Sequence, residues 1–174
     1  MMLISAFCPD RAGLVAAITG RIFDLGGNLG DTNFAVLGSG AEFTTVCEMP
    51  DEVSLADVEA DLRSLSALEG GALSVKLFEL SPVHGPQGKV THRVAVSGAD
   101  RPGLIARLSE VFGDYKANIV TLNAEYVPDG AKARYIIRFE VWIPDHEVDA
   151  CLATIANTAA QLGQVSHWEN VGKP

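Results

Sequence analysis

The feature that most constrains the fold is an internal repeat with an offset of ninety positions. Asp10-Arg11-Ala12-Gly13-Leu14 occurs again as Asp100-Arg101-Pro102-Gly103-Leu104, and further along Asn28 matches Asn118 without a gap. Solenoid repeats have periods of only about 20–50 residues. A period of ninety positions therefore predicts two copies of one small domain.

Composition limits the partners and the compartment that we expect. The chain of 174 residues is 48% hydrophobic, as in ordinary folded proteins, and its net charge is -9. Direct binding to DNA or RNA depends on Lys and Arg that neutralise phosphates, so this acidity argues against it. Three widely spaced cysteines without a signal peptide predict reduced thiols in the cytoplasm, and no apolar run is long enough to span a membrane.

The pattern of apolar residues predicts six elements in the first copy. Alternation predicts strands and a spacing of three or four predicts helices. Ser54 followed by Asp57 indicates a capping box at the start of the second helix. The order is strand, helix, strand, strand, helix, strand, over residues 2–7, 14–25, 29–37, 43–49, 55–65 and 73–80.

The second copy repeats this order. Its hairpin tip, residues 127–134, contains the turn signal Pro128-Asp129-Gly130, and residues 172–174 are expected to form a loose end. The order is that of the ferredoxin-like βαββαβ unit. We therefore expect an α+β protein with antiparallel sheets and helices on one face, organised as residues 1–80, a linker 81–89 and residues 90–174.

The repeated Asp-Arg-X-Gly-Leu turn is the candidate binding element. It joins a strand to the N-terminus of a helix, where free N–H groups attract a carboxylate or phosphate oxygen. The asparagine after each helix, Asn28 or Asn118, offers both a donor and an acceptor. A purely structural interpretation stays open, in which the aspartates cap the helices, the arginines pair with them and the asparagines occupy a turn.

These motifs resemble those of the ACT domain, over residues 1 to about 80 and about 90 to 171. Two such units in a chain of this size are similar to the glycine cleavage system transcriptional repressor family. ACT domains are mostly regulatory modules that bind amino acids or other small ligands at domain interfaces. By this resemblance the ligand-binding residues are Asp10, Arg11, Ala12, Gly13, Leu14, Asn28, Leu29, Asp100, Arg101, Pro102, Gly103, Leu104, Asn118 and Ile119.

The two copies differ at the candidate site. Ala12 stands where the family usually has proline, so the first turn is expected to be less rigid than the turn with Pro102. Gly30 stands where the second copy has Val120, and Gly26-Gly27 where it has Lys116-Ala117. Whether both copies bind the same ligand is left open.

No other pattern predicts a site. The histidines and cysteines lack the spacing of metal ligands, no base stands near Cys8, and Cys8 is expected to be a small buried residue. The aromatic residues Tyr126, Tyr135, Trp142 and Trp168 are expected in the core or in an interface. We therefore expect no catalytic residue, no metal and no cofactor.

Two function classes follow, with a small-molecule enzyme a distant third. The first is a non-enzymatic regulator that binds an amino acid such as glycine or serine at the ACT–ACT interface. It would form a homodimer and act on transcription through a DNA-binding regulator protein. The second is an assembly module without a ligand.

Overall fold

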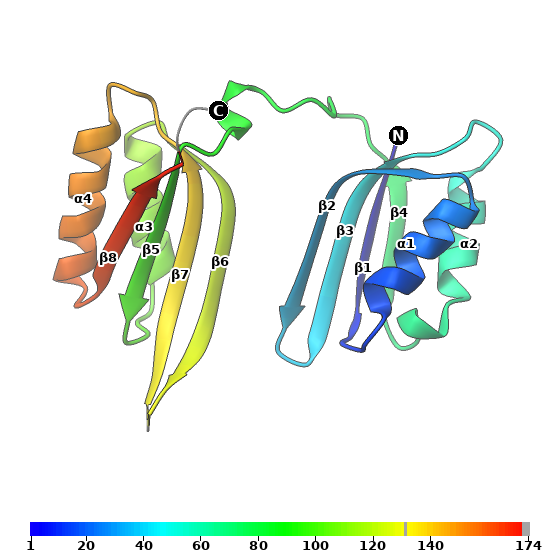
Figure 1. Ribbon diagram of the computed structural model, residues 1–174, viewed down its shortest axis with the longest axis horizontal. Coiled ribbons are helices and arrows are strands. Elements are labelled where there is room, and N and C mark those ends of the chain that lie inside the picture. The colour runs from blue at the N-terminus through cyan, green and yellow to red at the C-terminus, as the bar shows by residue number, and fades with distance from the viewer. Residues whose placement is uncertain (131, 172–174) are drawn as a thin grey trace. The chain divides into compact units, whose positions relative to one another are not determined.

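The computed structural model describes residues 1–130 and 132–171. The chain forms two compact units, Met1–Pro82 and Val83–Pro174, which we call unit 1 and unit 2 (Figure 1). Each is described by itself below.

Unit 1 is a four-stranded antiparallel sheet with the strand order β2-β3-β1-β4. Alternate residues of β1, namely Met2, Ile4, Ala6 and Cys8, are buried, because successive side chains of a strand point to opposite faces. The sequence-based prediction of this strand is confirmed. The elements are β1 (Met2–Pro9), α1 (Leu14–Asp24), β2 (Asn28–Leu37), β3 (Gly40–Glu48), α2 (Leu55–Arg63), the 3-10 helix η1 (Ser66–Leu68) and β4 (Ala72–Leu77).

The helices of unit 1 bury one stripe each. Leu14, Ile18 and Ile22 of α1 and Val58 and Leu62 of α2 pack into the same core as the buried face of β1 and β3. The capping box at the start of α2 is present, as predicted, because Asp57 N–H donates to Ser54 Oγ and Ser54 N–H donates to Asp57 Oδ2.

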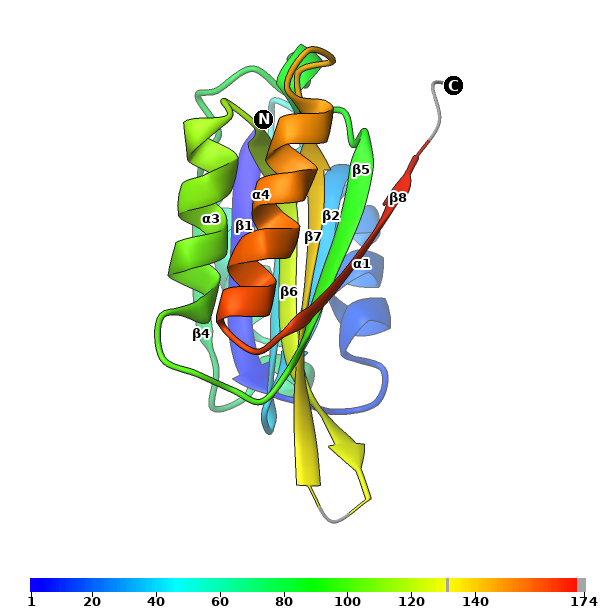
Figure 2. The same ribbon diagram turned by 90° about the vertical axis from the view of Figure 1, so that its left-hand side faces the viewer.

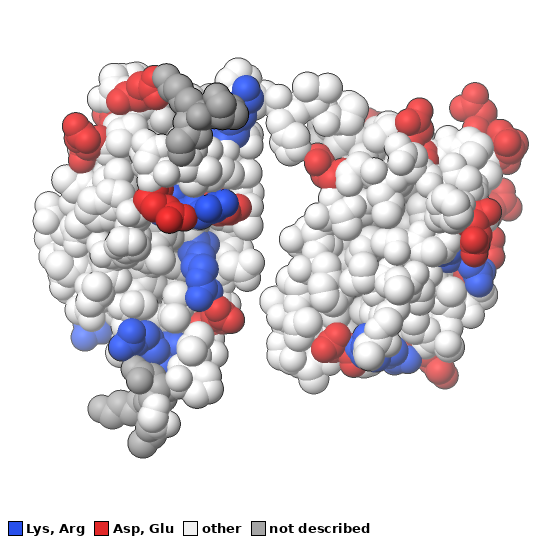
Figure 3. Space-filling view, viewed as in Figure 1, with Lys and Arg blue, Asp and Glu red and all other residues white. Residues whose placement is uncertain are grey.

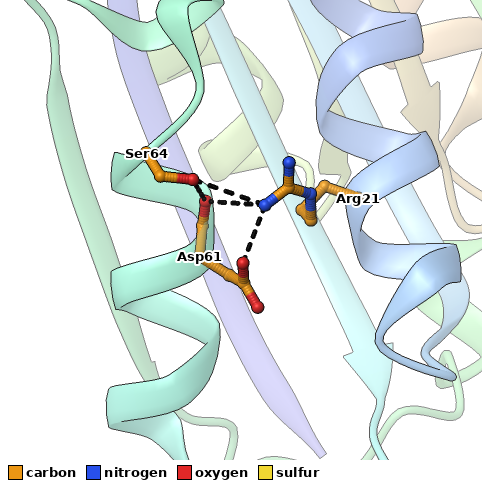
Figure 4. Close-up of polar contacts among 3 residues, drawn as sticks. All are labelled: Arg21, Asp61 and Ser64. Carbon is orange, nitrogen blue, oxygen red and sulfur yellow. Dashed lines mark hydrogen bonds and ion pairs between the residues drawn. The ribbon is translucent and has the colours of Figure 1, made fainter.

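A charged contact links the two helices of unit 1. The guanidinium of Arg21 on α1 lies 2.7 Å from Asp61 Oδ1 on α2 and also donates to Ser64 Oγ (Figure 4). Asp61 is half-buried against Arg21. A helical repeat predicts which face of a helix points outward, but not which side chain of a neighbouring helix reaches it.

Unit 2 repeats the architecture with the strand order β6-β7-β5-β8. Figure 2 shows α3 and α4 side by side on one face of its sheet. In the described part of unit 2 the opposite face carries no α-helix, which confirms the α+β class with helices on one face. The elements are η2 (Pro86–Gly88), β5 (His92–Gly98), α3 (Leu104–Asp114), β6 (Asn118–Asp129), β7 (Lys132–Trp142), α4 (Val148–Gln161) and β8 (Val165–Asn170).

The hairpin of unit 2 is more regular than the sequence indicated. We expected a tip over residues 127–134, but β6 and β7 stay paired as far as Asp129 opposite Lys132. The turn signal is therefore confined to the last few residues, of which Gly130 has a φ of 60°. The expected loose end, residues 172–174, lies outside the described residues.

Two aromatic residues are more exposed than a core position allows. Tyr126 keeps 61% of its accessible surface and Trp168 keeps 40%. Both residues therefore lie outside the core, because they stand on the edge strands β6 and β8, where less of the protein covers them. The other expected location, an interface, stays a prediction.

The two units differ in charge. Unit 1 carries 4 Lys and Arg against 12 Asp and Glu, a net charge of -8, whereas unit 2 carries 9 against 10, a net charge of -1. Within the described parts of both units, no helix is long and apolar enough to cross a membrane. Among those same residues, no group of three His, Cys, Asp or Glu side chains could hold a metal ion.

Candidate functional site

Each repeated turn has a glycine in the left-handed backbone region directly before a helix. Gly13 has a φ of 84° and Gly103 a φ of 80°, and α1 and α3 begin at the next residue. A residue with a Cβ is strained at such angles, so the turn itself requires glycine. The glycine is the N-cap residue in both units, and among the described residues neither helix has a side-chain N-cap hydrogen bond.

The turn of unit 1 lines a hollow of about 690 Å³ that is open to solvent. Its wall is residues 10–16, which are the turn and the first helical residues, together with Phe34 from β2. The N–H groups of a first helical turn lack partners within the helix and carry a partial positive charge. The hollow thus offers backbone donors on one side and the half-exposed ring of Phe34 on the other.

The two arginines of the turns reach away from the aspartates. Arg11 Nη1 donates to the carbonyl oxygen of Ser66 at 2.8 Å, and Nη2 donates to that of Glu69 at 3.2 Å. In unit 2 the Arg101 guanidinium lies beside Gly163, at the end of α4, since a Cβ built there would be 3.4 Å from Arg101 Nη2. Both arginines therefore link the turn to the segment that follows the second helix of their unit.

The two aspartates have different surroundings. The backbone N–H of Asp10 donates to Ser39 O at the hairpin tip at 2.9 Å, whereas the carboxylate of Asp100 accepts a hydrogen bond from Tyr126 Oη at 2.5 Å. The alternative that these aspartates cap the helices is wrong, because a glycine occupies each N-cap. Sequence reasoning missed the contact of Tyr126 with this turn, although its place near the end of a long hairpin strand was a usable signal.

The asparagines lie at the far end of the helix from the turn of the same unit. A helix of 11 residues, such as α1, is roughly 16 Å long, and Asn28 follows its C-terminus. Both Asn28 and Asn118 are exposed, and Asn118 Nδ2 donates to Gln87 O of η2 at 2.9 Å. Within one unit, then, the structure does not bring the turn and the asparagine together.

The apolar candidates contribute mainly to the cores. Leu14 and Leu104 are each 2% exposed, and Leu29 and Ile119 pack against the buried clusters of their units. The backbone N–H of Leu14 and that of Leu104 each donate to the carbonyl oxygen of the turn arginine at 3.3 Å. Ala12, Gly13, Pro102 and Gly103 are exposed and leave the turn backbone accessible.

Cys8 precedes the first turn but is 2% exposed, as predicted for a small buried cysteine. Burial raises the pKa of its thiol, with a smaller opposing effect from the Arg11 guanidinium. A thiol that stays protonated is a weak nucleophile. Cys8 is therefore a poor candidate for a nucleophile beside this turn.

Comparison with known proteins finds a matching family model for unit 1 and solved structures that share the fold of the whole chain. Residues 1–76 match the family model of the ACT domain (ACT_6). An unknown protein from Galdieria sulphuraria matches over 98% of each chain with 21% sequence identity and a TM-score of 0.76. A structure described as a "putative glycine cleavage system transcriptional repressor" matches over 99% of this chain and 97% of that chain, with 14% identity and a TM-score of 0.69. No curated protein sequence matches significantly.

Proposed function

We propose that this chain, whose first unit matches the ACT domain and whose second unit has the same fold, is a non-enzymatic regulatory protein that binds a small ligand. The ligand that best fits is an amino acid such as glycine or serine. The observation that carries the proposal is the hollow at the turn of unit 1, because unpaired N–H groups of a helix N-terminus can hold a carboxylate.

A complete site of this kind needs more than one ACT unit. The turn offers donors for a carboxylate, whereas an asparagine offers an acceptor for an ammonium group, and the two lie at opposite ends of α1. The proposed ligand therefore binds at an interface between ACT units, which a homodimer of the chain would supply. Ligand binding would shift the population of the state that contacts a partner.

The proposed partner is a DNA-binding regulator protein of genes for amino-acid metabolism, and the proposed location is the cytoplasm. A net charge of -9 supports contact with a protein rather than with DNA. The fold that this chain shares with the structure described as a repressor supports the proposed role in regulating transcription.

Thermal shift against the twenty amino acids, followed by calorimetry, tests the proposal. A ligand at a hundred times its Kd raises the free energy of unfolding by about 2.7 kcal/mol. Ala12→Glu places a carboxylate at the hollow and should abolish the shift, whereas the neutral isostere Ala12→Gln should retain most of it. Asn28→Ala should weaken binding, with Asn33→Ala, an exposed asparagine of β2, as the matched control.

Equal binding by Ala12→Glu and Ala12→Gln would contradict a carboxylate at this turn. A chain whose Tm no amino acid, nucleotide or folate changes would instead be the ligand-free assembly module.

A further inference from the structure

The helix-free face of unit 2 has an ordered array of charged side chains. In one row across the sheet, Ala95 of β5 lies between Arg138 of β7 and His167 of β8. In the next row on the same face, Arg93 lies between Glu140 and Glu169. Rows two residues apart along a strand are roughly 7 Å apart.

A hollow of about 490 Å³ lies over these two rows. Ala95 is the smallest side chain of the array, so the long side chains around it form a rim. Val94 and Phe139 also border the hollow, but their side chains are buried in the core, so they offer it mainly backbone. The floor is therefore the methyl group of Ala95 with strand backbone, and Thr121 and Asn123 of β6 add polar side chains to the lining. The rim is charged, and the size is that of small-molecule sites, about 300–1,000 Å³.

The rim presents both signs of charge. Arg93 Nε lies 2.9 Å from Glu140 Oε1, and Arg93 Nη1 lies 3.3 Å from Glu169 Oε1, which holds both carboxylates beside the hollow. Arg138 pairs through Nη1 with Glu125, and both side chains are half-exposed. An exposed ion pair contributes little, and a guanidinium has five N–H donors, so Arg138 can bind a further anion.

The fold does not require this array, because unit 1 lacks it. At the position of Ala95, unit 1 has Ser5 between Thr44 and Ser74, and at the position of Arg93 it has Leu3 between Val46 and Lys76. Figure 3 shows Lys, Arg, Asp and Glu side chains gathered over the strands of unit 2, whereas the strands of unit 1 are largely uncovered by charge in this view.

We propose that this hollow is a second binding site, separate from the repeated turns, for a small zwitterion. Its carboxylate would contact Arg138 and His167, its ammonium group would contact Glu140 and Glu169, and its hydrocarbon part would lie on Ala95. Glu140 and Glu169 share the single Arg93, so that row keeps an excess negative charge, whereas Arg138 has N–H donors beyond its ion pair with Glu125. The mixed rim therefore favours a molecule that carries both charges over a purely anionic or cationic one.

Backbone amide shifts of the 15N-labelled full chain, titrated with each of the twenty amino acids and with glycylglycine, test the site. At least one probe should shift the amides of β5, β7 and β8 around residues 95, 138 and 167. Ala95→Leu fills the hollow and should abolish these shifts, whereas Ser5→Leu, its counterpart in unit 1, should leave them unchanged. Arg138→Gln, a change at an exposed position, should weaken binding at least tenfold even if Ala95→Leu fails to fold.

Derivatives of the best probe test the two charges. Its N-acetyl form lacks the ammonium group and its amide lacks the carboxylate, so each should bind at least tenfold more weakly. Shifts confined to the turns at residues 10–14 and 100–104 would overturn this site while supporting the turn site. Absence of shifts on β5, β7 and β8 with every probe, equal binding by Arg138→Gln, or equal binding of the derivatives would also overturn it.

Discussion

The phenol of Tyr126 donates a hydrogen bond to Oδ2 of Asp100 at 2.5 Å, and so joins the hairpin of unit 2 to the turn before α3. Tyr126 also packs against Tyr135, with ring centroids 4.9 Å apart and the ring planes tilted by 44°. In unit 1 the register places Val36 opposite Ala41 where unit 2 has these two tyrosines. The turn of unit 2 is thus held by a side chain that unit 1 does not have.

This contact predicts that the phenol of Tyr126 loses its proton at a higher pH than an ordinary tyrosine does. The hydrogen bond to the Asp100 carboxylate raises the pKa of the Tyr126 phenol above its usual value, with smaller contributions from desolvation and from the charges of Asp100 and Tyr135. We expect Asp100→Asn to bring that pKa back toward about 10. NMR titration of 13C-labelled tyrosine ring carbons measures both values, and an unchanged pKa in the variant would show that the contact does not form in solution.

The left-handed backbone conformation of Lys116 predicts that glycine at this position stabilises the fold. It has a φ of 56° after α3, where the equivalent residue of unit 1 is Gly26 with a φ of 78°. Because a Cβ is strained in this region, Lys116→Gly should raise the free energy of unfolding by roughly 0.5–1 kcal/mol in urea unfolding. The reciprocal Gly26→Ala should lower it by about 1 kcal/mol or more, since its Cβ would also lie 3.0 Å from Pro50 Cγ. A loss of stability in Lys116→Gly would contradict this explanation.

The burial of all three cysteines predicts that their thiols do not react with thiol reagents while the protein is folded. Cys8, Cys47 and Cys151 are buried, and burial raises the pKa of each thiol, that of Cys151 to about 11. Because the thiolate is the reacting form, none should react with Ellman's reagent at pH 8 while the chain is folded. All three should react in guanidinium chloride, which serves as the control. Rapid labelling of one thiol before unfolding would show that its surroundings open in solution.

The capping box of α2 predicts a loss of stability in acid. Hydrogen bonds from the Ser54 side chain and backbone lower the pKa of Asp57. A carboxyl whose pKa is lower in the folded state adds stability above its unfolded pKa of about 3.9, and this contribution is lost as the pH falls through the folded pKa. The wild type should therefore exceed Asp57→Asn in stability at pH 7 by more than at pH 3. Urea unfolding at both pH values measures the two differences, and equal differences would contradict the argument.

Much of the fold could be predicted because it depends on local pattern. The alternation in Met2–Phe7 and the four-residue spacing of Leu14, Ile18 and Ile22 follow from the geometry of a strand and a helix. The 3-10 helices η1 and η2 were missed, because turns this short leave no apolar period to detect. The candidate turns were located by their repetition, which needs no three-dimensional information.

Contacts between distant elements could not be predicted in the same way. The links from Arg11 to Ser66 and from Tyr126 to Asp100 join residues far apart in the chain, and many side chains in each element could have made them. The charged rows around Ala95 depend on strand register, which a shift of one residue would move to the other face.

By itself, the sequence determined that the chain repeats one βαββαβ unit and that Gly13 and Gly103 begin matching helices, because periodicity and glycine geometry are local properties. Only the tertiary structure decided that Asn28 lies a full helix length from Gly13 in the same unit. It also decided that Arg93, Arg138 and His167 surround a hollow in unit 2, because side chains from separate strands meet only after the sheet has paired.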